Sequence, residues 1–323
     1  MIGYNVSMKY ATLFEHQPPV SRLVLGCGTK PFVKGQNCDE LLDGALKLGI
    51  NAFDTARGYG HSEKVLGQWL TKRNLHGKIF LETKGGLLGV FNQNRVNERC
   101  IRSDLMTSIR NLQTDRIDYY LLHRDNPSLE VGAIVEWMNT LIDEGKIVRY
   151  GVSNWRYTRI EQAISYATEH RLQAPVLSQT QYSLAVIHRW MWVGCTSVTG
   201  EQNENEREWY RNTQFPLFAF SPLANGFLSG KVRSSDRKSE RTLSFASRLA
   251  YCTPDNRERL SRCEALAAEL GVSVPQLALA YLLHSDMNVF PVVGSSKLST
   301  LKKSVAAANI SLSKEQLDYL NTL

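Results

Sequence analysis

An aspartate, a tyrosine, a lysine and a histidine are the residues of this chain with the clearest potential for chemistry. Asp54 and Tyr59 lie in NAFDTARGYG, residues 51–60, which has the pattern of a short strand followed by a loop. Lys84 ends the next strand-like run, and His123 ends the run after that. A lysine that pairs with a carboxylate is a cation, and it lowers the pKa of a phenol beside it. Together the four groups could protonate or deprotonate the oxygen of a carbonyl or an alcohol.

Each of these residues also has a purely structural explanation. An aspartate at a strand end often caps a helix or forms a turn. A lysine after a strand usually faces solvent, and His123 could equally be a satisfied structural histidine. Lys84 is harder to explain in this way, because it follows the apolar residues 79–81. The convergence of four polar groups on successive strand ends favours a catalytic site over coincidence.

Apolar runs with strand character alternate with segments of helical periodicity along the chain. We expect strands at residues 22–28, 51–56, 79–83, 117–122, 148–152, 175–181, 217–223 and 289–293. The helices that follow are expected at residues 39–48, 62–70, 97–112, 129–143, 158–170, 207–213, 275–284 and 299–308. A hairpin of residues 10–14 and the region around Val20 precedes them, and a loop is expected at residues 234–256. Two extra helices are expected at residues 257–270 and 313–320.

Eight strand and helix units predict an α/β fold, the closed parallel (β/α)8 or TIM barrel. An open doubly wound sheet is the alternative, but it would carry G-x-G-x-x-G after its first strand, and GCGTKPF lacks the third glycine. In a barrel the active site lies at the carboxyl ends of the strands. Asp54, Lys84 and His123 all occupy such positions.

The composition indicates one globular domain over residues 1–323. Hydrophobic residues make up 43% of the chain, enough for one large core, and no linker interrupts it. The net charge of +7 is scattered along the chain, which favours a solvated basic surface or an anionic small ligand over a nucleic-acid face. The six cysteines show no metal-binding spacing. With no signal-peptide pattern and no apolar run near about 18 residues, we expect a cytoplasmic protein without a membrane span or a metal site.

Several motifs resemble those of the aldo-keto reductase family over about residues 10–320. They are D-T-A-x-x-Y-G at residues 54–60, Lys84, L-x-H at 121–123, G-x-S-N at 151–154, Gln179 before Y-S-L, S-P-L at 221–223 and G-S-S-K at 294–297. Any one motif alone is weak, but in this order and spacing they are highly specific. The resemblance implies reversible reduction of an aldehyde or ketone to an alcohol with a nicotinamide cofactor.

The resemblance also implies roles for the four reactive residues. Tyr59 would be the general acid that protonates the carbonyl oxygen, and Lys84, held by Asp54, would lower the pKa of Tyr59 toward the working range. His123 would orient the carbonyl by a hydrogen bond. The partner would be a small-molecule carbonyl compound, and a monomer is the state that the family implies.

By the same resemblance, a further set of residues would bind the cofactor. Ser153, Asn154 and Gln179 would hold the nicotinamide carboxamide, and Phe220 would stack on the ring. Along the pyrophosphate would lie Ser221, Leu223 and the loop through Lys231.

The stretch GSSK and the helix after it would bind a phosphate. The strand that ends at Gly294 feeds a helix start expected at Ser295 and Ser296, where backbone N–H groups favour an anion. Lys297 would recognise a 2'-phosphate, with Ser304 nearby, which favours NADP. Thr300 and Ser304 depart from the residues found at these positions in many family members, so NAD stays possible.

Substrate specificity is expected from the loops at the carboxyl ends of the strands, at Lys30–Phe32, Leu87–Phe91, Arg124, Trp155 and Trp190–Trp192. An open mouth would suit bulky carbonyls such as sugars or aryl aldehydes. Two other functions stay open. One is a lyase in which Lys84 forms a Schiff base, which would require a neutral lysine. The other is a regulatory protein that binds the cofactor with little turnover.

Overall fold

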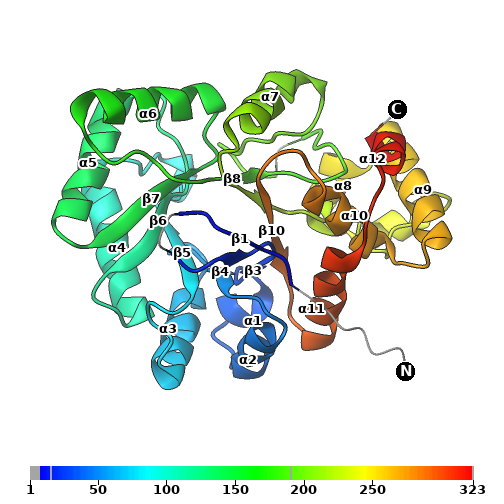
Figure 1. The fold of residues 1–323 in the computed structure, drawn as a ribbon, viewed down its shortest axis with the longest axis horizontal. Coiled ribbons are helices and arrows are strands. Elements are labelled where there is room, and N and C mark those ends of the chain that lie inside the picture. The colour runs from blue at the N-terminus through cyan, green and yellow to red at the C-terminus, as the bar shows by residue number, and fades with distance from the viewer. Residues whose placement is uncertain (1–7, 15–16, 190, 322–323) are drawn as a thin grey trace.

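Within the described residues, eight parallel strands close into a barrel, as the alternation of strands and helices predicts (Figure 1). The computed structural model describes residues 8–14, 17–189 and 191–321. Around the barrel the order is β10 (Val289–Gly294), β3 (Val24–Gly26), β4 (Ala52–Asp54), β5 (Phe80–Gly85), β6 (Ile117–Leu122), β7 (Ile147–Ser153), β8 (Ser178–Gln181) and β9 (Leu217–Phe220). Because β10 pairs with both β9 and β3, the sheet is closed and the open doubly wound alternative is wrong.

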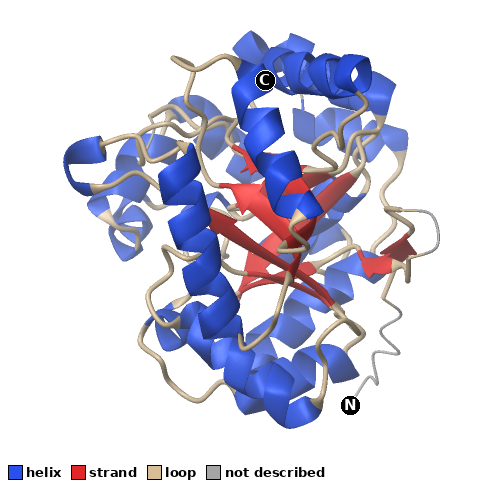
Figure 2. Cartoon of the chain, turned by 90° about the vertical axis from the view of Figure 1, so that its left-hand side faces the viewer, coloured by secondary structure: helices blue, strands red, loops and turns tan. Residues whose placement is uncertain are grey.

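Helices surround the strands of the barrel (Figure 2). Those that follow successive strands are α2 (Asp39–Lys47), α3 (Ser62–Arg73), α4 (Glu98–Leu112), α5 (Val131–Asp143), α6 (Tyr157–His170), α7 (Glu204–Thr213), α10 (Val274–Leu283) and α11 (Leu298–Val305). Helix α4 shows how the sequence defines them. Its N-cap Asn97 accepts a hydrogen bond from the backbone N–H of Cys100, and Gln113 ends it in the left-handed conformation. Its apolar residues recur every three or four positions and are buried, at Ile101, Leu105, Ile109 and Leu112.

Further elements lie between these units or follow the last of them. They are α1 (Lys30–Val33), α8 (Phe245–Tyr251), α9 (Pro254–Glu269), α12 (Lys314–Asn321) and the 3-10 turns η1 (Val90–Asn92), η2 (Glu201–Asn203), η3 (Ala224–Gly226), η4 (Arg237–Thr242) and η5 (Ala306–Asn309). The expectation of a loop at residues 234–256 is therefore wrong, because this segment holds η4 and α8. Helix α9 also begins earlier than expected, since the side chain of Thr253 caps it by accepting a hydrogen bond from the backbone N–H of Asn256.

Four strands are shorter than the sequence pattern indicates: β3 and β4 at both ends, β8 at its start and β9 at its end. Strand β8 begins at Ser178 rather than at residue 175, and β9 ends at Phe220 rather than at residue 223. Directly after Phe220, the φ angle of Ser221 is 53°, in the left-handed region, so the extended backbone ends there. The residues of the S-P-L motif consequently lie in the loop above the strand.

The N-terminal hairpin packs onto the aromatic interior of the barrel. As expected, β1 (Tyr10–Ala11) pairs antiparallel with β2 (Val20–Ser21). Phe14, which follows β1, stacks on Tyr119 with ring centroids 5.5 Å apart, and Tyr119 stacks on Phe80 at 4.2 Å. Phe218 and Phe290 extend these contacts across the barrel, so the five rings form one aromatic layer. This layer closes the barrel interior at the end where the strands begin.

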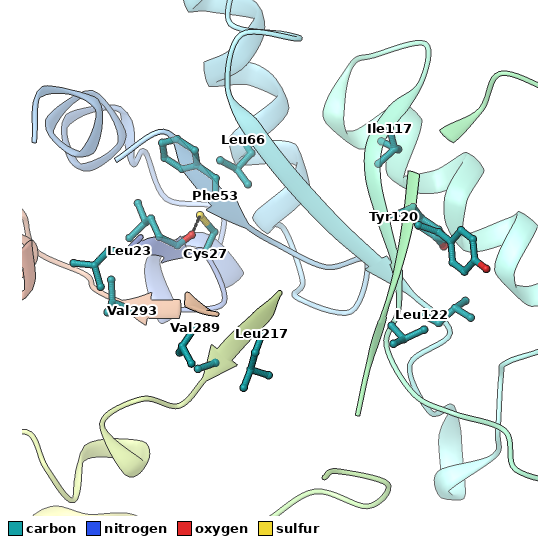
Figure 3. Close-up of a cluster of buried hydrophobic side chains, with 14 of the residues drawn as sticks. Leu23, Cys27, Phe53, Leu66, Ile117, Tyr120, Leu122, Leu217, Val289 and Val293 are labelled. Carbon is teal, nitrogen blue, oxygen red and sulfur yellow. Dashed lines mark hydrogen bonds between the residues drawn. The ribbon is translucent and has the colours of Figure 1, made fainter. Parts of the chain in front are cut away.

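The main hydrophobic core lies between the barrel and the surrounding helices (Figure 3). There Phe53 of β4 and Leu66 of α3 are completely buried. Helix α3 approaches α4 so closely that a Cβ atom added at Gly67 would lie 2.3 Å from the carbonyl oxygen of Asn111. A second hydrophobic cluster joins α8, α9, α10 and α12, which Figure 1 shows gathered on one side of the barrel.

Disulfides, membrane-spanning helices and metal sites would each indicate another class of protein. All six cysteines are free thiols. In the described part of the chain, each single helix is too short or too polar to cross a membrane. Helices α9 and α10 are long and apolar enough only when taken together, and the chain bends by 99° between them. Among the described residues, no three His, Cys, Asp or Glu side chains are grouped so as to hold a metal ion.

Candidate active site

A cavity of about 1340 Å³ opens where the barrel strands end. Asp54, Tyr59 and His123 line it. Lys84 lies just beneath and has no exposed surface. All twelve residues expected to bind a cofactor also line this cavity: Ser153, Asn154, Gln179, Phe220, Ser221, Leu223, Lys231, Gly294, Ser295, Ser296, Lys297 and Ser304. The fold thus brings the expected site residues together around one cavity.

Lys84 and Asp54 form a buried ion pair inside the barrel. They reach the same point because β4 pairs with β5 in parallel and alternate residues of each strand face inward. The ammonium group of Lys84 also donates a hydrogen bond to the carbonyl oxygen of Thr55, at 2.8 Å. Burial opposes the charge on Lys84, but the neighbouring Asp54, Tyr59 and Glu82 outweigh it and raise the pKa of the lysine above its usual value.

Glu82 is a further buried member of this group, and it belongs to none of the sequence motifs. It lies two residues before Lys84 on β5, so both side chains face the barrel interior. Its Oε1 lies 4.0 Å from the nitrogen of Lys84 and accepts a hydrogen bond of 2.6 Å from Gln179. The same amide nitrogen of Gln179 donates to Asp54 at 2.9 Å. The alternation of inward-facing positions along β5 could have identified Glu82 from the sequence.

Burial also determines the charge of Glu82. Loss of solvent raises the pKa of Glu82 well above its ordinary value; Lys84 acts against this rise, and the nearby Asp54 adds to it. The neutral acid form is therefore favoured. A neutral Glu82 leaves one cation, Lys84, facing one anion, Asp54, so the charges within the barrel balance.

Tyr59 lies between this ion pair and the open cavity. The nitrogen of Lys84 is 5.3 Å from the centroid of its ring, and the ring of His123 meets it edge-on at 5.6 Å. Gly28 makes room for it, since an added Cβ there would lie 3.2 Å from the tyrosine ring. Burial raises the pKa of Tyr59 to about 12, and Lys84 opposes this rise without reversing it. Lys84 therefore acts in the expected direction, but the expected net lowering of the pKa of Tyr59 is wrong.

His123 is held as a neutral imidazole. Burial, followed by the nearby charges of Lys84 and Arg124, lowers its pKa well below the ordinary value. Its Nδ1 atom is buried and has no hydrogen-bond partner among the described residues. A neutral imidazole beside Tyr59 can donate one hydrogen bond to an oxygen atom in the cavity.

Ser153, Asn154 and Gln179 line the cavity beyond the ion pair. The backbone of Asn154 has a φ angle of 62°, which turns the chain sharply at the end of β7. Its side-chain amide donates to Ser153 Oγ at 2.9 Å and to the carbonyl oxygen of His123 at 3.2 Å. These amides and hydroxyls form a rim of polar groups that can hold a carboxamide.

Basic side chains gather at the end of the cavity formed after β9 and β10. Lys231, Arg233, Lys297 and Lys303 line it there, and Arg233 alone has a carboxylate neighbour among the described residues, Glu264 at 3.8 Å. Arg233 and Lys303 were not expected from the motifs. Helix α11 begins at Leu298, so the expected helix start at Ser295 and Ser296 is wrong and both serines lie in the preceding loop.

The expected specificity residues divide into two groups. Leu87 and Arg124 line the cavity together with Trp192, which is half exposed. Trp155 instead is 1% exposed and donates from its indole nitrogen to the carbonyl oxygen of Arg124, at 3.2 Å. The cavity lining does not include Trp155, Lys30–Phe32, residues 88–91 or Met191, so these expectations are wrong. Trp190 lies outside the described residues.

Comparison with known proteins gives the family. The model of the aldo/keto reductase family matches residues 23–323. The chain belongs to the aldo/keto reductase family. It is 28% identical over 292 residues to the aryl-alcohol dehydrogenase GME11368 of Pestalotiopsis microspora, covering 87% of this chain and 71% of that protein.

Two further similarities, one to a solved structure and one to a protein sequence, concern fold and function. The crystal structure of the thermostable aldo-keto reductase Tm1743 in complex with the inhibitor epalrestat has a TM-score of 0.72 and 23% identity, covering 97% of this chain and 99% of that one. The chain is also 28% identical over 293 residues to a Schizosaccharomyces pombe protein named "Putative voltage-gated potassium channel subunit beta", covering 84% of this chain and 78% of that protein. The family supports oxidoreductase activity on carbonyl groups in general.

Proposed function

We propose that this aldo/keto reductase reduces an aldehyde or ketone to an alcohol with NADPH. The observation that carries the proposal is the position of Tyr59, which lines the cavity while Lys84 and Asp54 form a buried ion pair beneath it. A phenol with a pKa of about 12 stays protonated at neutral pH and can give a proton to the carbonyl oxygen.

The other residues of the group would orient the substrate and hold the charge. The neutral His123 would donate a hydrogen bond to the same carbonyl oxygen. As Tyr59 loses its proton, the cation of Lys84 stabilises the phenolate that forms. Asp54 holds the lysine in place, and Gln179 and Glu82 hold Asp54.

The lining of the cavity fits a nicotinamide nucleotide. The polar rim of Ser153, Asn154 and Gln179 suits the carboxamide, and the flat ring of Phe220 suits the nicotinamide. When bound, the cofactor would supply the hydride that reduces the carbonyl carbon. The lysines at positions 231, 297 and 303 lack a carboxylate neighbour among the described residues, so they suit phosphate groups and favour NADP over NAD.

A Schiff-base lyase is disfavoured by the burial of Lys84. Such a lysine must be neutral and reachable, whereas Lys84 has no exposed surface, is paired with Asp54 and has a raised pKa. A cofactor-binding regulator stays the second candidate, because one of the relatives is named as a channel subunit.

The test compares the wild-type protein with Tyr59→Phe, and with Tyr319→Phe on α12 as the matched control. Each protein is titrated with NADPH and NADH by protein fluorescence and then assayed with a panel of aldehydes. We expect tighter binding of NADPH, turnover by wild type and Tyr319→Phe, and a loss of at least about 100-fold in Tyr59→Phe with unchanged nucleotide binding. Binding without turnover would favour the regulator, and absence of binding would refute the reductase.

A further inference from the structure

Arg124 is a buried cation in the wall of the cavity to which the proposed reaction assigns no role. It follows His123 at the end of β6, and only 6% of its surface is exposed. Leu87, Trp192 and Cys195 line the cavity with it. The charge of Arg124 acts to lower the pKa of both Tyr59 and His123, in keeping with its place in the wall of the same cavity.

Two hydrogen bonds hold the guanidinium in one position. Its Nε donates to the carbonyl oxygen of Val193 at 3.0 Å, and Nη1 donates to the carbonyl oxygen of His123 at 2.8 Å. Gly194 lies directly against the side chain, since an added Cβ there would be 3.1 Å from Cδ of Arg124. A guanidinium has five N–H donors, so more than half of them have no partner among the described residues.

No described carboxylate forms an ion pair with this arginine. The partly buried Arg159 and Arg95 differ in this respect, because they pair with Asp125 and Asp104. Nor does the catalytic group balance the charge: Lys84 is already paired with Asp54, and the pKa shifts of Glu82 and His123 favour the neutral form of each. An uncompensated buried cation is unfavourable, and a bound anion would relieve that cost.

The cofactor phosphates are not the anion that Arg124 would meet. Arg124 follows β6, whereas Lys297 follows β10, and these strands lie four positions apart in either direction around the closed barrel. The arginine and the basic end of the cavity are therefore on opposite sides of the mouth. On the side of Arg124 the apolar side chains of Leu87 and Trp192 complete the wall.

We propose that Arg124 binds a carboxylate group of the substrate, so that this aldo/keto reductase prefers carbonyl compounds with a carboxylate at a distance from the reacting carbon. The inference rests on the proposed reductase function and adds the class of substrate. The planar fork of a guanidinium matches a carboxylate with two parallel hydrogen bonds. Leu87 and Trp192 would contact the apolar part of the molecule between carbonyl and carboxylate.

The test uses two aldehydes that differ in one charge, 4-carboxybenzaldehyde and methyl 4-formylbenzoate. We expect kcat/KM of the wild-type enzyme to be at least about 10-fold higher for the acid than for the ester. Arg124→Gln keeps a donor for the backbone but lacks the charge. In this variant the value for the acid should fall about 10- to 100-fold, and that for the ester less than about 3-fold. Arg124→Lys should restore part of the preference.

Arg189→Gln is the control, because this arginine is exposed and precedes the same segment. It should leave the preference unchanged. Equal losses for acid and ester in Arg124→Gln, or no preference in the wild type, would overturn the proposal. If the glutamine variant does not fold, a reduced preference in Arg124→Lys supports the proposal and an unchanged one refutes it.

A binding experiment separates this proposal from the reductase function. The thermal unfolding of the wild-type protein is measured with benzoate and with benzamide in the presence of NADP. If benzoate but not benzamide raises the unfolding temperature of the wild-type protein, and benzoate has no such effect on Arg124→Gln, the carboxylate site is supported even if no aldehyde is turned over. Turnover of neutral aldehydes without any effect of benzoate would refute the site and leave the reductase function intact.

Discussion

Two carboxyl groups, a lysine and a glutamine share the inside of the barrel beneath Tyr59. Glu82 and Asp54 are adjacent in the register of β4 and β5, and Gln179 donates to both. If both carboxyl groups were ionised, the buried group would carry an excess negative charge beside the phenol. A proton on Glu82 avoids this, so Glu82 serves to orient Asp54 without adding charge.

Replacing Glu82 by glutamine tests this charge state through stability. A raised pKa in the folded state means that folded wild-type protein keeps a proton that the unfolded chain releases above its own pKa of about 4.5. The wild type therefore loses stability relative to Glu82→Gln as the pH rises from about 4.5, by up to about 1.4 kcal/mol per pH unit, until Glu82 ionises. Urea unfolding between pH 4.5 and 7.5 measures this difference.

The exposed Glu269 on α9 provides the control for this comparison. Glu269→Gln should follow the wild-type stability curve across the same pH range. A pH dependence of Glu82→Gln that is parallel to the wild type would show that Glu82 is ionised in the folded protein.

The high pKa of Tyr59 predicts opposite pH dependences for the two directions of the reaction. Reduction needs the protonated phenol, which is present below a pKa of about 12 and is lost only as the pH rises through it. Oxidation needs the phenolate, so its rate should increase with pH. We expect kcat/KM for reduction to show no loss attributable to Tyr59 between pH 7 and about 10. A decline with a midpoint near neutrality, absent in Tyr59→Phe, would contradict this expectation.

At the scale of the elements, β5 places three inward-facing residues in order along the barrel axis. Phe80 belongs to the aromatic layer, Glu82 to the buried polar group, and Lys84 lies directly beneath the cavity. The strand thus leads from the closed end of the barrel to its reactive end. Because the side chains alternate every second residue, a shift of one position would turn all three outward.

The contact between α3 and α4 gives a prediction for packing. An alanine in a helix is normally more favourable than a glycine. At Gly67, however, the added Cβ would lie 2.3 Å from the carbonyl oxygen of Asn111 and 2.7 Å from the carbonyl carbon of Leu112. We expect Gly67→Ala to destabilise the protein by about 1–3 kcal/mol in urea unfolding. Ser103→Ala, at an exposed position of α4, should change stability little, and an equally small effect of Gly67→Ala would show that the helices separate freely.

At the scale of the whole molecule, the sequence was sufficient to predict the closed barrel. Alternating strands and helices determine it, because each apolar run is too short for a core helix and the strand and helix unit recurs eight times. The residues of the site also converge as predicted, since strand ends meet at one face of a barrel. The barrel and the meeting of Asp54, Lys84 and His123 needed only periodicity and order along the chain, whereas the cofactor residues were predicted from the resemblance to the family.

The remaining features depend on contacts that periodicity does not encode. Helix α8 was missed because a polar segment gave no apolar repeat, and its burial arises from a cluster with α9 and α10. Trp155 was assigned to the substrate loops, but its indole nitrogen finds a partner in the carbonyl oxygen of Arg124. The net pKa of Tyr59 depends on how much burial outweighs Lys84, which is a balance of distances in three dimensions.

The complete enclosure of Lys84 makes this residue a chemical reporter of barrel opening. Its amine has no exposed surface, whereas the side chain of Lys72 is 59% exposed. In native buffer an amine-acylating reagent should modify Lys72 rapidly and leave Lys84 unmodified, as peptide mass spectrometry can show. With increasing urea, labelling of Lys84 should follow global unfolding, because the amine is reached only when β4 and β5 separate. Labelling of Lys84 at the rate of Lys72 without urea would show that the barrel opens locally.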